Sequence, residues 1–176
     1  MLLLNELNDQ NDWEEICKDY ELSEEIISQF ENKVSWYNIS QYQSLSEKFI
    51  EKYKDKVIWY CICMYQHLSI PFLEQHLQYL DWFYVCSYQI LTEEFIEKHI
   101  QDISWLRISE SQKLSENFIE KYKDKVDWDY ISTCQELSEE FILKHEEYVN
   151  WLQLYMSNRI SQNFIKEHKD KFEFII

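Results

Sequence analysis

Seven tryptophans divide this chain of 176 residues into units of equal length. They are Trp13, Trp36, Trp59, Trp82, Trp105, Trp128 and Trp151, and each lies 23 residues after the one before it. A hydroxyl residue keeps the same spacing from Ser23 to Ser161, and Leu or Ile precedes it each time. A fixed period without insertions indicates a repeat architecture, in which each unit buries its apolar face against the next copy.

Each unit predicts two short helices, which are clearest in residues 114–135. Ser115 is a suitable N-cap for the first, because its hydroxyl can accept hydrogen bonds from the free amides of the first turn. The apolar positions from Phe118 to Val126 recur at helical spacing and predict a helix of about 11 residues. Asp127 caps a second helix of about 8 residues that begins at Trp128. Helices this short are marginal alone, so contacts between neighbouring repeats must stabilise them.

The repeats predict an all-α fold, an α-solenoid of seven 23-residue helix-turn-helix repeats that forms a single domain over residues 1–176. Residues 1–12 form an acidic N-terminal cap ahead of the first repeat, and residues 174–176 form a short tail. We expect Ser35, Ser104 and Asn150 to cap the second helix in their repeats, and only Ile58 to break that pattern.

The repeat motif L-S-E-x-F-I-E-K-(Y/H)-x-D-x-(V/I)-D-W-x-x-I-S-x-x-Q resembles a short helical repeat found in mostly uncharacterised proteins of AT-rich bacteria, phages and giant DNA viruses. The likeness covers nearly the whole chain, although the first repeat departs from the motif at Cys17, Tyr20 and Ile26. The resemblance implies a helical repeat protein in a viral or mobile-element setting, and it implies no activity. The absence of Gly and the single Pro also favour an AT-rich genome.

Charge and cysteine content limit the functional classes. A formal net charge of -16 argues against direct binding of nucleic acid or of an anionic membrane. The five cysteines are odd in number and scattered, which favours a reducing cytoplasm, that of the host cell if a phage encodes the chain. The N-terminal apolar run is too short and too acidic for a signal peptide, and no apolar stretch is long enough to span a membrane.

Histidine and cysteine columns are the candidates for metal binding. His76, His99, His145 and His168 share one repeat position, which Phe30, Tyr53 and Tyr122 occupy in other repeats. A position that alternates with aromatic residues indicates a packed site rather than a metal ligand. Cys61, Cys63 and Cys86 would need a fourth zinc ligand such as His67, and Ser40, Ser109 and Ser132 hold the position of Cys63 elsewhere. We therefore interpret this column as a small buried side chain.

Two polar columns have structural interpretations. Glutamines recur at the end of the second helix, where free carbonyls need donors, and predict an amide ladder between repeats: Gln43, Gln66, Gln89, Gln112 and Gln135. Acidic residues recur beside the caps, and helix capping explains them. Because no pair of carboxylates has distinct surroundings, we expect no enzyme activity, no catalytic residues, no metal and no cofactor.

A charge-poor middle is the first candidate binding surface. Residues 58–92 contain only Glu74 and Asp81 as charged groups, and they are rich in Tyr and Met. Exposed clusters of this kind mark protein interfaces, whereas the alternative is that this region is more deeply buried. The predicted partner-binding residues are Ile58, Tyr60, Met64, Tyr65, Leu77, Tyr79, Phe83, Tyr84, Tyr88 and Ile100.

Two acid-rich segments are the second candidate. Residues 1–35 hold ten acidic residues and two Lys, and residues 128–150 hold six acidic residues and one Lys. The predicted acidic patch comprises Glu14, Glu15, Asp19, Glu21, Glu24, Glu25, Glu136, Glu139, Glu140, Glu146 and Glu147.

The leading hypothesis is a non-catalytic protein-binding module, a phage or mobile-element protein that binds a host protein complex and inhibits it. A CRISPR-type defence nuclease would fit, as in an anti-CRISPR protein. One alternative is an acidic nucleic-acid mimic that occupies a basic groove. Another is a structural array that binds copies of itself, the simplest case being a homodimer.

Overall fold

A computed structural model of the chain describes residues 12–173. These residues form short helices joined by turns and bends, and they contain no β-strand. The predicted all-α class and the series of helix-turn-helix repeats are therefore confirmed. Apart from Asp12, the predicted acidic cap lies outside the described residues, as does the predicted tail at residues 174–176.

The chain divides into two compact units, Met1–Gln89 and Ile90–Ile176. The first contains α1 (Trp13–Asp19), α2 (Glu24–Gln29), α3 (Trp36–Tyr42), α4 (Glu47–Lys52), α5 (Trp59–Tyr65), α6 (Ile70–Gln75), the 3-10 helix η2 (Leu77–Tyr79) and α7 (Trp82–Tyr88). The second contains α8 (Glu93–Lys98), α9 (Trp105–Ser111), α10 (Glu116–Lys121), α11 (Trp128–Cys134), α12 (Glu139–Lys144), α13 (Trp151–Met156), α14 (Gln162–Glu167) and α15 (Lys169–Phe172). A single domain over both units stays a prediction.

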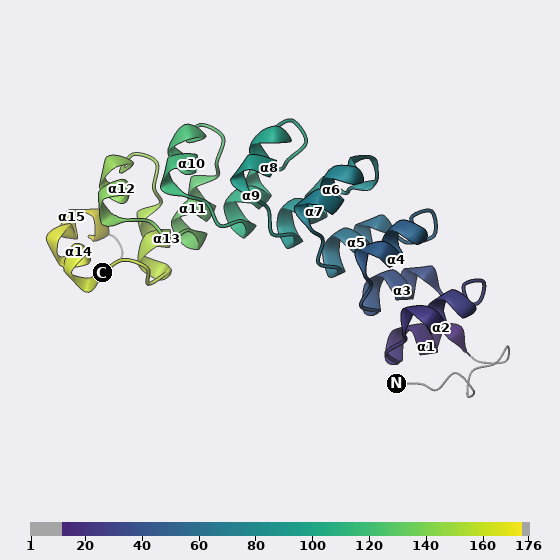
Figure 1. Cartoon of the computed structure of the whole chain (residues 1–176). Coiled ribbons are helices and arrows are strands. Elements are labelled where there is room, and N and C mark those ends of the chain that lie inside the picture. The colour runs from purple at the N-terminus through teal and green to yellow at the C-terminus, as the bar shows by residue number, and fades with distance from the viewer. Residues whose placement is uncertain (1–11, 174–176) are drawn as a thin grey trace. The chain divides into compact units, whose positions relative to one another are not determined.

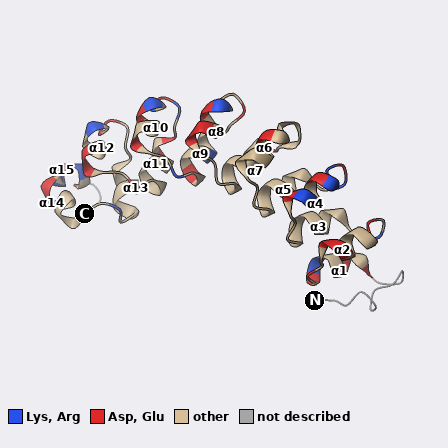
Figure 2. Cartoon of the chain, in the orientation of Figure 1, with Lys and Arg blue, Asp and Glu red and all other residues tan. Residues whose placement is uncertain are grey.

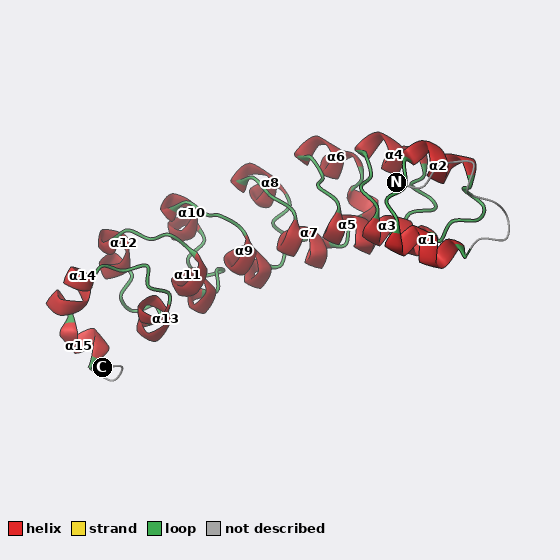
Figure 3. Ribbon diagram, turned by 90° about the horizontal axis from the view of Figure 1, so that it is seen from below, coloured by secondary structure: helices red, strands yellow, loops and turns green. Residues whose placement is uncertain are grey.

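Two rows of helices make up each unit. We call the helices that begin at a tryptophan A helices and those that follow a Ser or Thr cap B helices. In the first unit the A helices α1, α3, α5 and α7 contact one another in series, and the B helices α2, α4 and α6 form the other row (Figures 1 and 3). In the second unit α9, α11 and α13 contact one another in series. Each tryptophan-to-tryptophan period therefore adds one hairpin to a stack.

Trp59 in the first unit and Trp128 in the second occupy equivalent niches between the two rows. Trp59 Nε1 donates to the carbonyl oxygen of Lys54 at 2.9 Å, and its ring lies 6.4 Å from that of Phe72. Trp128 in the second unit repeats both features, with a 2.9 Å bond to Lys123 and a 6.4 Å ring separation from Phe141. Equal spacing in the sequence therefore reflects equal geometry at these positions.

The glutamine column forms hydrogen-bond clamps, in which each side-chain amide bonds to the backbone of the hairpin before it. Gln66 Oε1 accepts the backbone N–H of Leu45 at 3.0 Å, and Gln66 Nε2 donates to the carbonyl oxygens of Ser40 and Gln43 at 3.2 and 2.8 Å. Gln43 and Gln135 make the same three kinds of bond in their own repeats. The predicted ladder thus exists, but it joins side-chain amides to the backbone of the preceding repeat.

The acid that follows the B-helix cap also joins neighbouring repeats. The Glu116 carboxylate accepts the backbone N–H of Ser138 at 2.6 Å, 22 residues further along the chain. The same bond recurs between Glu24 and Ser46, Glu47 and Ser69, and Glu93 and Ser115. The sequence suggested only a favourable charge in the first helical turn.

Two local expectations were wrong. The helix predicted over about 11 residues is six residues long, Glu116–Lys121, because Tyr122 leaves helical geometry at φ -116° and ψ 26°. Its carbonyl oxygen accepts from the N–H groups of Lys125 and Val126, so a turn returns Val126 to the core. Ser104 occupies the N-cap position of α9 but makes no side-chain capping bond. Ile58 lacks that bond too, as predicted.

Candidate protein-binding face

The outer arc of the A helices is the candidate site. At about 100° per residue, the second, third, sixth and seventh residues of each A helix form one arc, and the first, fourth and fifth face the opposite way. In α5 the fourth and fifth residues, Ile62 and Cys63, are fully buried, whereas Tyr60 and Tyr65 on the outer arc are 42% and 45% exposed. The core therefore fixes one side of each A helix and leaves the second and seventh positions of the arc open to solvent, whereas Cys61 at the third position of α5 is buried.

Aromatic residues fill this arc in three consecutive A helices of the first unit. Six of them belong to the second and seventh positions, and the third position of α7 adds one more. We call this set the aromatic face: Tyr37 and Tyr42 on α3, Tyr60 and Tyr65 on α5, and Phe83, Tyr84 and Tyr88 on α7. All are exposed except Tyr84, which is half-buried.

Ring contacts and one hydrogen bond from Gln41 connect the face from one repeat to the next. The rings of Tyr60 and Tyr84 lie 5.9 Å apart, and those of Tyr84 and Tyr88 lie 6.1 Å apart. Between α3 and α5, Gln41 Nε2 donates to the Tyr65 hydroxyl at 3.4 Å. Aromatic side chains in contact lose little conformational freedom when a partner binds, which favours their use as anchors.

The aromatic face is electrically neutral. The helices α3, α5 and α7 contain no acidic or basic residue, as their uniform tan colour shows (Figure 2). A hydrogen bond with Cys61, followed by the loss of hydration and the nearby Tyr37 hydroxyl, raises the pKa of Tyr60 to about 12. This phenol therefore stays protonated at physiological pH. Depletion of charge together with enrichment of Tyr and Phe is the composition of protein interface cores.

The structure separates the predicted partner-binding residues into two sets. Tyr60, Met64, Tyr65, Phe83, Tyr84 and Tyr88 lie together on the outer arc of α5 and α7.

The remaining four predicted residues lie elsewhere. The Tyr79 ring in η2 stacks on Trp59 at 4.8 Å and so belongs to the packing between helix rows, and Leu77 lies in the same 3-10 helix. Ile58 is half-buried at the start of α5, where its N–H donates to Ser40 Oγ at 2.9 Å. Ile100 lies after α8 in the second unit.

Tyr37 and Tyr42 belong to the aromatic face, and the sequence interpretation missed them. That interpretation relied on the low charge of residues 58–92, whereas α3 precedes this window. The available signal was the repeat register, since Tyr37 and Tyr42 hold the same repeat positions as Tyr60 and Tyr65.

The predicted acidic patch also separates into groups. Glu14, Glu15 and Asp19 are exposed on the outer arc of α1, Glu21 is exposed just after that helix, and Glu25 is exposed in the first turn of α2.

Several other members of the predicted acidic patch are bonded within the chain. The Glu24 and Glu139 carboxylates accept hydrogen bonds from Ser46 and Ser161. Glu136 and Glu146 pair with Lys113 and Lys171 at 3.8 and 2.8 Å. Glu140 and Glu147 are exposed.

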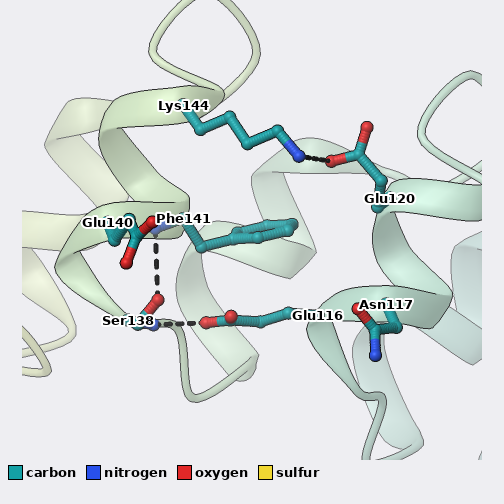
Figure 4. A pocket seen from close by; sticks show the side chains of 7 residues that line it. All are labelled: Glu116, Asn117, Glu120, Ser138, Glu140, Phe141 and Lys144. Carbon is teal, nitrogen blue, oxygen red and sulfur yellow. Dashed lines mark hydrogen bonds and ion pairs between the residues drawn. The ribbon is translucent and has the colours of Figure 1, made fainter.

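A groove of about 250 Å³ between α10 and α12 shows how such acids are used (Figure 4). Glu116 bonds to the N–H of Ser138, and Glu120 accepts from Lys144 Nζ at 2.7 Å. An equivalent groove of about 610 Å³ lies between α2 and α4, with Glu24, Lys48 and Lys52 in its lining. The polar groups of these grooves hold adjacent B helices together, so we do not take them as a ligand site.

The histidine and cysteine columns lie inside the units. His76 and His145 are buried, and each ring nitrogen Nε2 faces a glutamate of the preceding repeat, Glu51 and Glu120. Burial raises the pKa of the Cys63 thiol to about 11, which disfavours the nucleophilic thiolate. Within residues 12–173, no three His, Cys, Asp or Glu side chains lie close enough to hold a metal ion.

Comparisons with models of protein families, with curated proteins and with solved structures found no match to this chain. In the part of the chain that the structure describes, no helix is both long and apolar enough to cross a membrane.

Proposed function

We propose that this chain is a non-catalytic protein-binding repeat module that docks its partner on the aromatic face. The observation that carries the proposal is the set of seven aromatic side chains on one neutral arc of three adjacent helices. Tyr and Phe are enriched, and charged residues depleted, at the centres of protein interfaces, where such rings become buried anchors.

The second unit shows that the fold does not require aromatic residues at these positions. In α9 the outer arc carries Leu106, Arg107, Glu110 and Ser111, while Ile108 and Ser109 keep the buried positions. The same hairpin therefore forms with a charged outer arc. Keeping six large rings exposed in the first unit needs an explanation other than folding, and partner binding supplies one.

Two features support the non-catalytic part of the proposal. The Cys61, Cys63 and Cys86 side chains are fully buried, and the His76 and His145 rings serve packing and contacts between repeats. The recurring acids beside the caps bond to the next repeat. These Cys, His and Glu side chains, whose types are often used in acid-base and nucleophilic chemistry, therefore have structural uses.

From the small size, the acidity and the AT-rich composition of the chain, we infer a host protein complex such as a defence nuclease as the partner. The alternative of nucleic-acid mimicry requires a continuous negative stripe. Lysines interrupt such a stripe in the second unit, where Lys121 pairs with Glu97, Lys144 with Glu120, and Lys171 with Glu146. We therefore favour docking through the aromatic face.

The test compares tagged variants that differ only on the outer arc. The chain is expressed in its native host as the parent form, as Tyr60→Ala/Phe83→Ala/Tyr88→Ala, and as the control Leu106→Ala/Leu152→Ala, whose leucines are also exposed at the second A-helix position. We expect the first variant to lose its co-purified protein while the control retains it, with unchanged circular dichroism for both. Equal recovery with all three forms would reject the aromatic face as the docking surface.

A further inference from the structure

The outer arc of the first unit changes its chemistry at α1. Its second, third and seventh residues are Glu14, Glu15 and Asp19, which are all exposed, and Lys18 holds the sixth position. The equivalent positions in α3 and α5 are neutral. We call Glu14, Glu15 and Asp19 the acidic end.

The acidic end adjoins the aromatic face directly. Helices α1 and α3 are in contact, and Asn38 Nδ2 on the outer arc of α3 donates to the carbonyl oxygen of Glu14 at 3.0 Å. Because α1, α3, α5 and α7 belong to one compact unit and contact one another in series, a single surface runs from carboxylates to aromatic rings.

Folding explains the acidic end only in part. Glu14 and Glu15 lie in the first turn of α1, where a negative charge interacts favourably with the helix dipole. Asp19 is the last residue of the same helix, where a negative charge is unfavourable. In the other repeats this position holds Tyr, Ser or Cys. Within residues 12–173 no ion pair involves the carboxylates of Glu14, Glu15 or Asp19, whereas Glu31 in the turn after α2 pairs with Lys56 at 3.4 Å.

From this arrangement we infer that the docked partner is a protein segment with Lys or Arg residues at one end and apolar or aromatic residues along the rest. Its basic end lies over α1, and its apolar side chains lie over α3, α5 and α7. Charge complementarity favours this direction, because a reversed segment would place apolar side chains over the carboxylates and carry its cations away from them. This inference rests on the proposed function and adds the chemistry and direction of the partner.

Helix spacing gives the length of the segment. Neighbouring packed helices lie about 8–10 Å apart, so the four A helices span roughly 24–30 Å. An extended chain covers that distance with about 8 residues, since each residue advances it by about 3.3 Å. A library of random 12-residue peptides therefore contains segments that can reach the whole surface.

The experiment selects displayed random 12-residue peptides on the purified full chain and determines their sequences. We expect the enriched peptides to carry Lys or Arg clustered at one end and apolar or aromatic residues at the other. Binding of a selected synthetic peptide should fall at least about tenfold at low salt with Glu15→Lys/Asp19→Lys. The control Glu25→Lys/Asp55→Lys changes the net charge equally on exposed residues outside the outer arc and should leave the affinity unchanged.

Reversing the charge of both the peptide and the acidic end gives the decisive comparison. A peptide with its basic residues replaced by Glu should bind Glu15→Lys/Asp19→Lys more tightly than the parent chain. Peptides that depend on Phe83 but show no basic cluster, or no response to Glu15→Lys/Asp19→Lys, would overturn this inference and leave the proposed function in place. Peptides whose binding ignores Tyr60→Ala/Phe83→Ala, or a selection with no enrichment, would count against both.

Discussion

The A helices α5 and α9 have the same length and bury the same side, but their outer arcs carry different kinds of residue. Ile62 and Ile108 are fully buried at equivalent positions, and Gln66 and Gln112 follow the helices as buried residues. On the outer arc, α5 carries Tyr60 and Tyr65, whereas α9 carries Leu106 and Ser111. The comparison shows that the inner positions are shared by the two repeats, while the residues of the outer arc differ.

The largest expected effect concerns the shared inner side. Ile62→Ala in the first unit and Ile131→Ala in the second should each reduce the free energy of unfolding by about 2–5 kcal/mol, because both side chains are fully buried. Urea denaturation followed by circular dichroism measures the loss. Ile90→Ala is the matched control, since Ile90 is 85% exposed. A large loss in one unit and none in the other would show that the two cores are not equivalent.

The glutamine clamps should give the next largest effect. Gln66→Leu and Gln135→Leu each leave buried backbone groups of the preceding repeat without their partner, at a cost of about 1–3 kcal/mol. The exposed Gln78→Leu serves as the control in the same denaturation experiment. Stability equal to that of the parent chain would mean that the clamps contribute nothing.

The constant 23-residue spacing explains why this inner side could be predicted from the sequence. Tryptophans at 23-residue intervals and hydroxyl caps repeat without interruption, and the glutamine column runs from Gln43 to Gln135, so the sequence of one repeat predicted its neighbours. The bonds from the cap-adjacent glutamates to the next repeat could not be found in this way. The Glu116 to Ser138 bond joins residues 22 apart, and local capping rules do not include it. The predicted length of the first helix was wrong because Phe118, Tyr122 and Val126 keep helical spacing although a turn follows Tyr122.

The proposed binding surface was only partly predictable for a related reason. Low charge identified α5 and α7 but also included Leu77 and Tyr79, which lie in the 3-10 helix beside Trp59. Which aromatic rings point outward depends on the register of each A helix against the core, and this register became clear only from the buried fourth and fifth positions.

Exchanging the outer arcs should have a small effect on stability. Replacing Tyr60 and Tyr65 of α5 by Leu and Ser, as in α9, should change the free energy of unfolding by less than about 1 kcal/mol, because surface substitutions perturb the fold little. The same denaturation midpoint measures it. A loss as large as that of Ile62→Ala would show that these tyrosines support the fold rather than a partner.

The pH response should give the smallest effect and should concern the contacts between B helices. Hydrogen bonding from Lys144 is the main cause that lowers the pKa of Glu120 below its ordinary value of 4.5, and His145 adds to it. The folded state therefore favours the ionised carboxylate. Its contribution to stability is present above pH 4.5 and disappears as the pH falls through the lowered pKa.

Glu120→Gln tests this response through the pH dependence of the thermal midpoint. We expect the parent chain to be the more stable at pH 7 and the difference to shrink below pH 4.5. Glu140→Gln, on the same groove, is the control. A constant difference down to pH 3 would contradict the assignment.

Site-specific photo-crosslinking in the native host tests the central claim most directly. A photoreactive phenylalanine analogue is placed at position 83 in one sample and at position 106 in another, two exposed positions with the same place in their A helices. If the aromatic face binds a partner, the probe at position 83 forms a discrete crosslinked species with another protein and the probe at position 106 does not. Crosslinks of equal yield at both positions, or at position 106 alone, would contradict the account.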